Sequence, residues 1–297
     1  NIHAEEREDL VNFLKRYLRF HLDILLAVYK KLLLKTDKRT FAFLFNLKSV
    51  LLNSPSRLSW QGENFLVTDS GLPEFQYKIR HQRQCNMAYE FGIKKRAANL
   101  ADCYFLNKID FQDNDTFLDC GANVGDLKIW FELHSKKINY VGFEPSPTEF
   151  RCLQDNVNPS QVYNVGLWNK EGELEFYISS QGGDSSLIEP KKFDEKIISR
   201  VTRLEEYVTS PIKCLKLEAE GAEPEILEGL GDKLNLIEFI SADLGYERGI
   251  ASESTLVPVT NFLLAKGFEL IEVTQGRICA LYRNKSKLEK IKDIDKL

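Results

Sequence analysis

The sequence predicts an α/β fold: a mostly parallel sheet covered by helices on both faces, preceded by a helical and hairpin extension. Short apolar runs alternate with amphipathic stretches between residues 116 and 282. This alternation is typical of strand–helix–strand units that form a parallel sheet with two covered faces. Before residue 80, apolar residues recur first at helical spacing and then in short runs divided by turn residues. That pattern predicts helices followed by a hairpin.

Size and charge narrow the class of protein. A chain of 297 residues suits one α/β domain with an appendage, or two modest domains. The net charge of −4 argues against a general nucleic-acid binder. Residues 1–60 hold 11 Lys and Arg against 6 Asp and Glu, whereas the rest of the chain holds 29 against 38. The sequence therefore predicts a basic appendage before an acidic body.

The cysteines and the apolar stretches indicate in which cellular compartment we expect the protein. Six scattered cysteines form no CxxC pair, so we expect reduced core residues of a cytoplasmic protein rather than disulfides. Four histidines, none of them near a cysteine cluster, argue against a zinc site. No stretch reaches the roughly 18 apolar residues of a membrane span. Four acids among the first ten residues do not fit a signal peptide.

Residues 1–75 are expected to form the appendage. Residues 5–34 and 39–52 follow helical spacing, and Lys and Arg decorate the first of these segments. One interpretation is a peripheral membrane contact or a partner-binding helix. The favoured interpretation is a helical hairpin packed on the body or on the second subunit of a homodimer. Residues 57–79 predict a hairpin with strands at 58–60 and 65–68.

The body is expected to span residues 76–284, with a charged, fraying tail at 285–297. A polar helix at 83–107 leads into it. The predicted strands are 116–120, 140–143, 162–165, 214–217, 236–242, 268–273 and 278–282. The predicted helices between them are 125–134, 147–156, 223–229 and 255–266. Two glycines in the segment 166–180 interrupt this alternation of strands and helices and predict a hairpin insertion.

The sharpest motif is Thr116–Gly125, where a buried strand ends in Asp119, turns through Gly121 and Gly125, and begins a helix. Ligands of open α/β sheets bind at this edge, near the switch point of the strand order. Glycines let a ligand approach the backbone closely, and a helix N-terminus favours a carboxylate or phosphate. The spacing is GxxxG rather than the GxGxxG of dinucleotide sites, which favours a ligand without a pyrophosphate. A tight turn without a ligand is the alternative.

Glu144 ends the second strand of the body, 25 residues after Asp119. One strand–helix–strand step places it beside the first loop, where a carboxylate can accept hydrogen bonds from both ribose hydroxyls. Ser146, Pro147 and Glu149 match a capping box with proline at the first helical position. Because the capping box accounts for Ser146 and Glu149, neither is assigned a catalytic role.

Charged residues also gather at the ends of two further strands. Lys216, Glu218 and Glu220 alternate along the end of the fourth strand. Such groups are costly at that position unless they bind a ligand or each other, and a salt-bridged turn is the alternative. After the fifth strand, Asp243 and Glu247 are candidate bases. A plain surface turn is the alternative there.

Together these segments resemble the FkbM family of methyltransferases, which depend on S-adenosylmethionine (SAM). The matching segments are Leu118–Gly125, Phe143–Pro147, Val201–Leu204 and Lys216–Glu223, within residues 112–283. The resemblance implies a Rossmann-like, class I methyltransferase sheet with an antiparallel closing strand. The apolar runs 268–273 and 278–282 agree with such a closing pair.

The resemblance further implies SAM as the cofactor, with contacts at Gly121, Asn123, Gly125 and Glu144, to which we add Asp119. Many relatives methylate sugar hydroxyls in glycan or natural-product biosynthesis, so a small-molecule or glycan acceptor and O-methylation are implied. One departure is Glu218, which stands where the family usually has Asp. The extra methylene displaces the carboxylate by about a bond length.

Methyl transfer is an in-line attack on the sulfonium methyl, and most of its rate comes from alignment. A neutral hydroxyl also benefits from a base or a metal ion. We predict that Asp243, Glu218 or Glu220 supplies this help, and we assign no metal ligands. The segment Ser179–Leu187 is either a lid over the substrate or an inert surface loop. The alternative functions are an NAD(P)-dependent oxidoreductase and a non-catalytic glycan-assembly scaffold.

Overall fold

The computed structural model describes residues 16–17, 29, 32–179, 183–274 and 276–287. The helix expected at 5–34 and the tail expected at 285–297 therefore lie largely outside the described residues. Among the described helices, none is long and apolar enough to cross a membrane.

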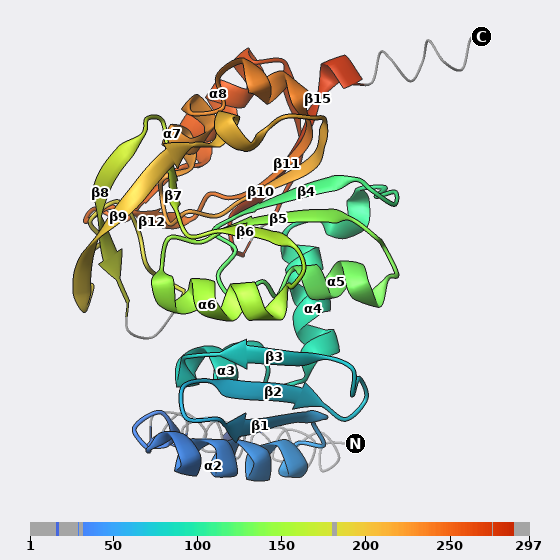
Figure 1. The fold of residues 1–297 in the computed structure, drawn as a ribbon, viewed down its shortest axis with the longest axis vertical. Helices are drawn as coiled ribbons and strands as arrows, with labels where there is room; N and C mark the ends of the chain where they lie inside the picture. Colours follow the sequence, from blue (N-terminus) through green and yellow to red (C-terminus); the bar gives the residue numbers. More distant parts are fainter. Residues whose placement is uncertain (1–15, 18–28, 30–31, 180–182, 275, 288–297) are drawn as a thin grey trace, which may run out of the picture.

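Ahead of the main sheet, one helix packs on a small antiparallel sheet (Figure 1). The helix is α2 (Lys38–Leu51), and the strands are β1 (Ser56–Trp60), β2 (Phe65–Asp69) and β3 (Gln76–Ile79). The Asp37 carboxylate caps α2 by accepting hydrogen bonds from the backbone N–H groups of Arg39 (3.0 Å) and Thr40 (3.1 Å). The expected hairpin is present as β1 and β2, and β3 adds a third strand to it.

The single helix predicted at 83–107 is wrong, because the chain forms two helices there. They are α3 (Gln82–Ala88) and α4 (Ile93–Cys103), followed by a short 3₁₀ turn η1 (Leu106–Lys108). The break lies at Gly92, which has φ +94°, and a Cβ on it would lie 2.6 Å from Asp69 Oδ2. That carboxylate also accepts a 2.8 Å hydrogen bond from Ile93 N. The contact with β2 therefore fixes where α4 begins.

The main sheet has seven strands in the order β14-β15-β11-β10-β4-β5-β6. Their bounds are β4 (Thr116–Cys120), β5 (Asn139–Phe143), β6 (Gln161–Tyr163), β10 (Ile212–Leu217), β11 (Ile237–Asp243), β14 (Phe268–Val273) and β15 (Cys279–Asn284). The central strands pair in parallel, and β15 runs antiparallel to both β11 and β14. The Rossmann-like sheet with an antiparallel closing strand is confirmed.

The strand order reverses between β4 and β10. The chain runs outward from β4 to β5 and β6, and then returns to the other side of β4 to form β10 and β11. Loops that leave a sheet in opposite directions at such a point leave a crevice between them, which is where open α/β sheets bind ligands. The carboxyl ends of β4 and β10 are therefore the place to look for the site.

Helices cover both faces of the main sheet (Figure 1). They are α5 (Lys128–Leu133), α6 (Pro147–Asn156), α7 (Glu223–Glu228) and α8 (Leu256–Ala265), with 3₁₀ turns η2 (Leu204–Tyr207) and η3 (Gly231–Leu236). Adjacent β4 residues serve the two cores, because Phe117 packs in one cluster and Leu118 in the other. The cluster of Phe117 continues into the N-terminal layer through Phe41 of α2 and Phe65 of β2.

The hairpin predicted at 166–180 is wrong. Strands β7 (Gly166–Trp168) and β8 (Gly172–Ile178) do not pair with each other but flank β9 (Glu195–Arg203), parallel on one side and antiparallel on the other. A further pair, β12 (Tyr246–Arg248) and β13 (Glu253–Ser254), follows β11. These small sheets stand at the carboxyl edge of the main sheet and enlarge the wall around the crevice.

Candidate active site

A cavity of about 510 Å³ lies at the carboxyl ends of β4, β5 and β10. It takes its walls from the loops after these strands, from α3 and α4, and from the segment at 183–187. Of the site residues predicted from sequence, seven line it: Asp119, Gly121, Asn123, Glu144, Glu218, Glu220 and Glu247. Within the described part of the chain, Gly125 and Asp243 are not on the wall. The strand-end prediction thus brings most of the named residues together.

The loop after β4 is longer than predicted, because α5 begins at Lys128 rather than at 125. Gly121, Asn123 and Gly125 all have positive φ (+73°, +49° and +84°), which is incompatible with a helix. A Cβ on Gly121 would lie 1.8 Å from the carbonyl oxygen of Glu218, so the β4 and β10 loops touch at that glycine. A Cβ on Gly125 would instead lie 2.4 Å from Val157 Cγ1. The structure therefore explains Gly125 by packing against the end of α6.

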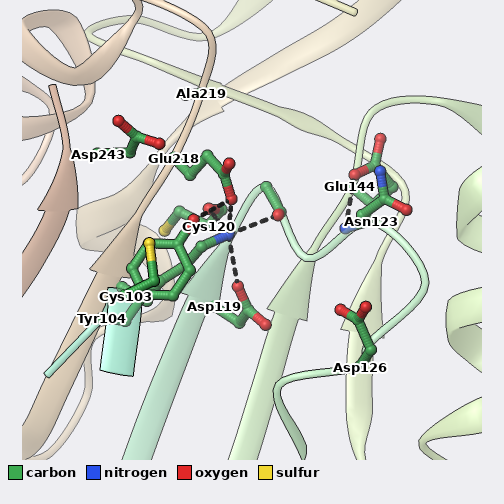
Figure 2. A network of polar contacts seen from close by, with 12 residues as sticks. Cys103, Tyr104, Asp119, Cys120, Asn123, Asp126, Glu144, Glu218, Ala219 and Asp243 are labelled. Atoms are coloured by element: carbon green, nitrogen blue, oxygen red, sulfur yellow. Dashed lines mark hydrogen bonds and ion pairs between the residues drawn. The ribbon is translucent and has the colours of Figure 1, made fainter. Parts of the chain in front are cut away.

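Lys216 ties the ends of β10 and β4 together. Its ammonium lies 3.0 Å from Asp119 Oδ1 and 3.1 Å from Glu218 Oε2, and it donates to the carbonyl oxygens of Cys120 (3.1 Å) and Gly121 (2.7 Å). Figure 2 shows Asp119 and Glu218 converging on this centre. Burial disfavours the charged lysine, but attraction to Asp119 and Glu218 outweighs it and raises the pKa of Lys216. Of the costly charges noted in the sequence, Lys216 and Glu218 are thus bound to each other.

Glu218 is held on its other side by Arg277 and Tyr104. The Arg277 guanidinium pairs with both Glu218 and Asp243, and the Tyr104 hydroxyl donates to Glu218 Oε2 at 2.5 Å. Burial opposes ionisation, but Lys216 and then Arg277 overcome it and lower the pKa of Glu218 to about 2. Burial raises the pKa of Asp243, although Arg277 offsets part of this rise. Both acids are therefore engaged as partners of fixed cations.

Glu144 lies where the sequence placed it, beside the loop after β4. Its carboxylate accepts hydrogen bonds from Asn123 N (2.9 Å) and Ser146 N (2.8 Å), as Figure 2 shows for Asn123. Its side of the pocket is nearly closed, since Glu144 is 7% exposed. Burial, and then repulsion by Glu149, raises the pKa of Glu144 to about 8. The remaining lone pairs of the carboxylate are available to hydroxyl donors.

The capping box predicted at the start of α6 does not form. Ser146 stands at the N-cap position without a side-chain cap hydrogen bond, and its hydroxyl donates to the Glu149 carboxylate instead. Glu149 also lies 2.7 Å from His81 Nε2. His81, which precedes α3, binds Glu149 and holds it away from the end of α6. Ser146 and Glu149 therefore form part of the pocket wall rather than a helix cap.

Sequence reasoning missed the wall contributed by α3 and α4. Gln84 Nε2 donates to Asn123 Oδ1 at 2.7 Å, while Gln84 Oε1 is buried with no hydrogen-bond partner among the described residues. Arg96 Nε pairs with Asp126 Oδ2 at 2.7 Å. All four residues line the pocket. Nothing in the local sequence marks Gln84 or Arg96, since their approach to the loop is a tertiary contact.

The far wall carries Glu220 and Glu247. Glu220 lies in the tight turn after β10 with φ +50°, and Glu247 lies on β12, and both line the pocket. Burial, and then the charge of Glu247, raises the pKa of Glu220. Burial, and then the charges of Asp243 and Glu218, raises the pKa of Glu247 to about 7. In both Glu220 and Glu247 the pKa is raised, whereas in Glu218 it is lowered.

The segment predicted as lid or surface loop borders the same wall. Ser186 Oγ donates to the carbonyl oxygen of Glu220 at 2.9 Å, and Asp184 pairs with Arg83 at 2.6 Å. These contacts place residues 183–187 at the pocket, and closure of this segment stays a prediction. Among the described residues, no group of three or more His, Cys, Asp and Glu could hold a metal ion.

A family model described as "Methyltransferase FkbM domain" matches residues 119–270, just over half of the chain. "Methyltransferase 1" of Beauveria bassiana is 25% identical over 186 residues, covering 52% of this chain and 75% of that protein. "Hexuronic acid methyltransferase AglP" of Haloferax volcanii is 26% identical over 139 residues, covering 45% of this chain and 57% of that protein. The chain thus spans little more than half the length of the archaeal protein.

Solved structures give weaker similarities. A SAM-dependent methyltransferase from Aquifex aeolicus has a TM-score of 0.38 and 12% identity, covering 64% of this chain and 95% of that chain. TrmK of M. capricolum, in complex with S-adenosylhomocysteine, has a TM-score of 0.35 and 11% identity, covering 63% and 68%. Nothing about function follows from similarities of this size.

Proposed function

Because the chain belongs to the FkbM family of methyltransferases, we propose that it transfers the methyl group of SAM to a hydroxyl oxygen of a sugar. The methyl donor is SAM, and the pocket at the switch point is the place for it. The observation that carries the proposal is Glu144, which ends β5 on the pocket wall and reaches back to Asn123 in the loop after β4. A carboxylate in this position suits the two hydroxyls of an adenosyl ribose.

The other residues of the pocket fit the chemistry of SAM. The buried Gln84 Oε1, which lacks a hydrogen-bond partner among the described residues, is an acceptor ready for an amino group of the ligand. Arg96, held by Asp126, is a cation within the pocket wall for a carboxylate. Acidic side chains outnumber basic ones on the wall, which suits a sulfonium cation. When bound, SAM supplies the electrophilic methyl group.

The protein's own part in the reaction is to align the acceptor, exclude water and take up a proton. Of the three acids predicted to help, Glu218 and Asp243 are neutralised by Arg277. Glu220 faces the pocket from the turn after β10. The acceptor side of the pocket is therefore the wall formed by this turn, β12 and residues 183–187.

The sugar as acceptor is supported by the relative from Haloferax volcanii, which is named a hexuronic acid methyltransferase. Membership of a methyltransferase family disfavours both the oxidoreductase and the non-catalytic scaffold. Several predictions from the sequence stay predictions: a cytoplasmic location, membrane contact or homodimerisation through the N-terminal helices, and domain boundaries at 75 and 284.

The proposal is tested by incubating the purified protein with SAM and three acceptors: a hexuronic acid glycoside, a neutral glycoside and a primary amine. We expect release of S-adenosylhomocysteine with a glycoside, and a product whose mass rises by one methyl group on oxygen. Transfer to the amine alone would refute O-methylation while leaving the methyltransferase assignment intact.

A further inference from the structure

We propose that Glu247 is the general base that takes the proton of the acceptor hydroxyl, and that Glu220 is a neutral carboxylic acid that donates a hydrogen bond to the acceptor. This assignment rests on the proposed function and adds to it the route of the proton. Of the three acids favoured by sequence it keeps Glu220, and it adds Glu247, a candidate base of the sequence analysis; both line one wall of the pocket.

The fold holds these two acids on facing segments. A Cβ on Gly221, which follows Glu220, would lie 2.6 Å from Arg248 Cα, so the turn after β10 packs directly against the backbone of β12. Arg248 donates to the Gly221 carbonyl oxygen and binds Glu225 of α7 through two hydrogen bonds of 2.9 and 2.7 Å. This bidentate contact fixes β12 to the turn with defined geometry. Glu220 precedes Gly221 and Glu247 precedes Arg248 in the sequence. The two acids therefore lie on segments in contact with each other.

Their lack of cationic partners separates these acids from the others. Among the described residues, neither the Glu220 nor the Glu247 carboxylate forms an ion pair or a hydrogen bond. Glu218, in contrast, is bound by Lys216, Arg277 and Tyr104, and Asp243 is bound by Arg277. A carboxylate whose oxygens already bind a cation is less free to accept a proton from a ligand than one without partners.

The charges around the pair support different roles for its members. Burial, Asp243, Glu218 and Glu223 raise the pKa of Glu247 to about 7 against the opposing effect of Arg277. Burial also raises the pKa of Glu220, with contributions from Glu247, Glu218, Asp184 and Glu223. Because a charge on Glu247 raises the pKa of Glu220, Glu220 is disposed to keep its proton when Glu247 has lost its own. A base whose pKa is close to the working pH is the most effective, and pairs with separated pKa values divide acid and base roles.

The bonds in the step balance without a further reactant. The acceptor oxygen forms a bond to the methyl carbon as the methyl–sulfur bond breaks, and the electrons of that bond remain on sulfur. The hydroxyl proton passes to a Glu247 carboxylate oxygen. Glu220 donates its hydrogen bond throughout and neither gains nor loses a proton.

The test compares Glu247→Gln and Glu220→Gln with Glu253→Gln, an exposed residue of β13 on the same small hairpin. With p-nitrophenyl glucuronide as the acceptor probe, we expect Glu247→Gln to lower kcat by about 100-fold or more and to abolish the acidic limb of the pH–rate profile. Because an amide also donates a hydrogen bond, we expect Glu220→Gln to lower kcat by about threefold to tenfold, far less than Glu247→Gln, and the control Glu253→Gln to match wild type. Equal losses in the two variants, or a Glu247→Gln enzyme that keeps its kcat, would overturn the proposal.

A second readout needs no acceptor. Infrared spectra of the complex with S-adenosylhomocysteine, recorded across neutral pH, report protonated carboxyl groups directly. Subtracting variant from wild-type titrations cancels the signal of Glu144, which titrates in the same range. We expect the subtraction for Glu247→Gln to show a group titrating near neutrality, and that for Glu220→Gln to show a carboxylic acid that persists above it. If both signals are absent, the roles of Glu247 and Glu220 are wrong, even where the protein transfers methyl groups. If wild type transfers no methyl group to any glycoside, the proposed function is refuted instead.

Discussion

Lys216 Nζ lies 3.0 Å from Asp119 Oδ1 where β10 and β4 end side by side, and both side chains are at most 2% exposed. The same ammonium binds the carbonyl oxygens of Cys120 and Gly121, at the start of the loop that borders the pocket. The strands on either side of the switch point are thus joined by a buried ion pair. This pair forms part of the wall of the pocket, and its charges offset each other.

Removing the lysine should therefore destabilise the fold. We expect Lys216→Met to lower the free energy of unfolding by about 3–5 kcal/mol, because Asp119 would remain as a buried charge without its partner. Combining it with Asp119→Asn should recover part of that loss. Urea denaturation followed by circular dichroism measures both variants. If Lys216→Met matched wild type in stability, the ion pair would not be what holds the two strand ends.

Alanine substitutions at Gly121 and Gly62 distinguish the effect of a steric clash from the effect of backbone strain. Both have positive φ, but a Cβ on Gly121 would lie 1.8 Å from the Glu218 carbonyl oxygen, whereas a Cβ on Gly62 meets nothing within 4 Å. We expect Gly62→Ala to cost about 1 kcal/mol and to leave binding of S-adenosylhomocysteine unchanged. Gly121→Ala should be less stable and should bind the ligand at least about tenfold more weakly, because the loop must move. Calorimetry with the two variants checks this, and equal binding by both would show that the loop contact is unimportant.

Stability should also respond to the titration of Glu144. The pKa of its carboxyl is raised from 4.5 to about 8 by burial and by Glu149, so the folded state binds this proton more tightly than the unfolded state does. Its contribution to stability is complete below the unfolded pKa and is lost as pH rises through the folded pKa. We therefore expect unfolding free energies measured between these two pH values to fall less steeply in Glu144→Gln than in wild type. Glu253→Gln should keep the wild-type slope, and an unchanged slope in Glu144→Gln would contradict the assignment.

The strand ends of the site could be predicted because their signals are local. β4 at Thr116–Cys120 and α6 at Pro147–Asn156 have the bounds that the sequence predicts, since turn glycines and a proline mark their ends. From the alternation of strands and helices, Asp119 and Glu144 could be placed at one edge of the sheet. Those residues now line one pocket.

What the sequence did not reveal depends on contacts between distant segments. β9 escaped prediction because much of it is exposed and charged, as at Glu195, Lys196 and Arg200, so it lacks a clear apolar pattern. Arg277 binds Glu218 and Asp243 from the loop before β15. No residue spacing in the sequence predicts that contact. The same holds for Gln84, which meets Asn123 only in the folded protein. Sequence could therefore name the acids of the site but not tell which of them are already neutralised.

The most direct test of the account is whether Glu144 recognises the ribose of the cofactor. Calorimetry would compare S-adenosylhomocysteine with its 2′,3′-dideoxyribosyl analogue, in wild type and in Glu144→Ala. An intramolecular or ligand hydrogen bond contributes about 0.5–1.5 kcal/mol, so wild type should prefer the natural ligand with its two hydroxyls by roughly tenfold, and the variant should lose that preference. Equal binding of both ligands by wild type, or a preference that survives in Glu144→Ala, would contradict the placement of SAM in this pocket.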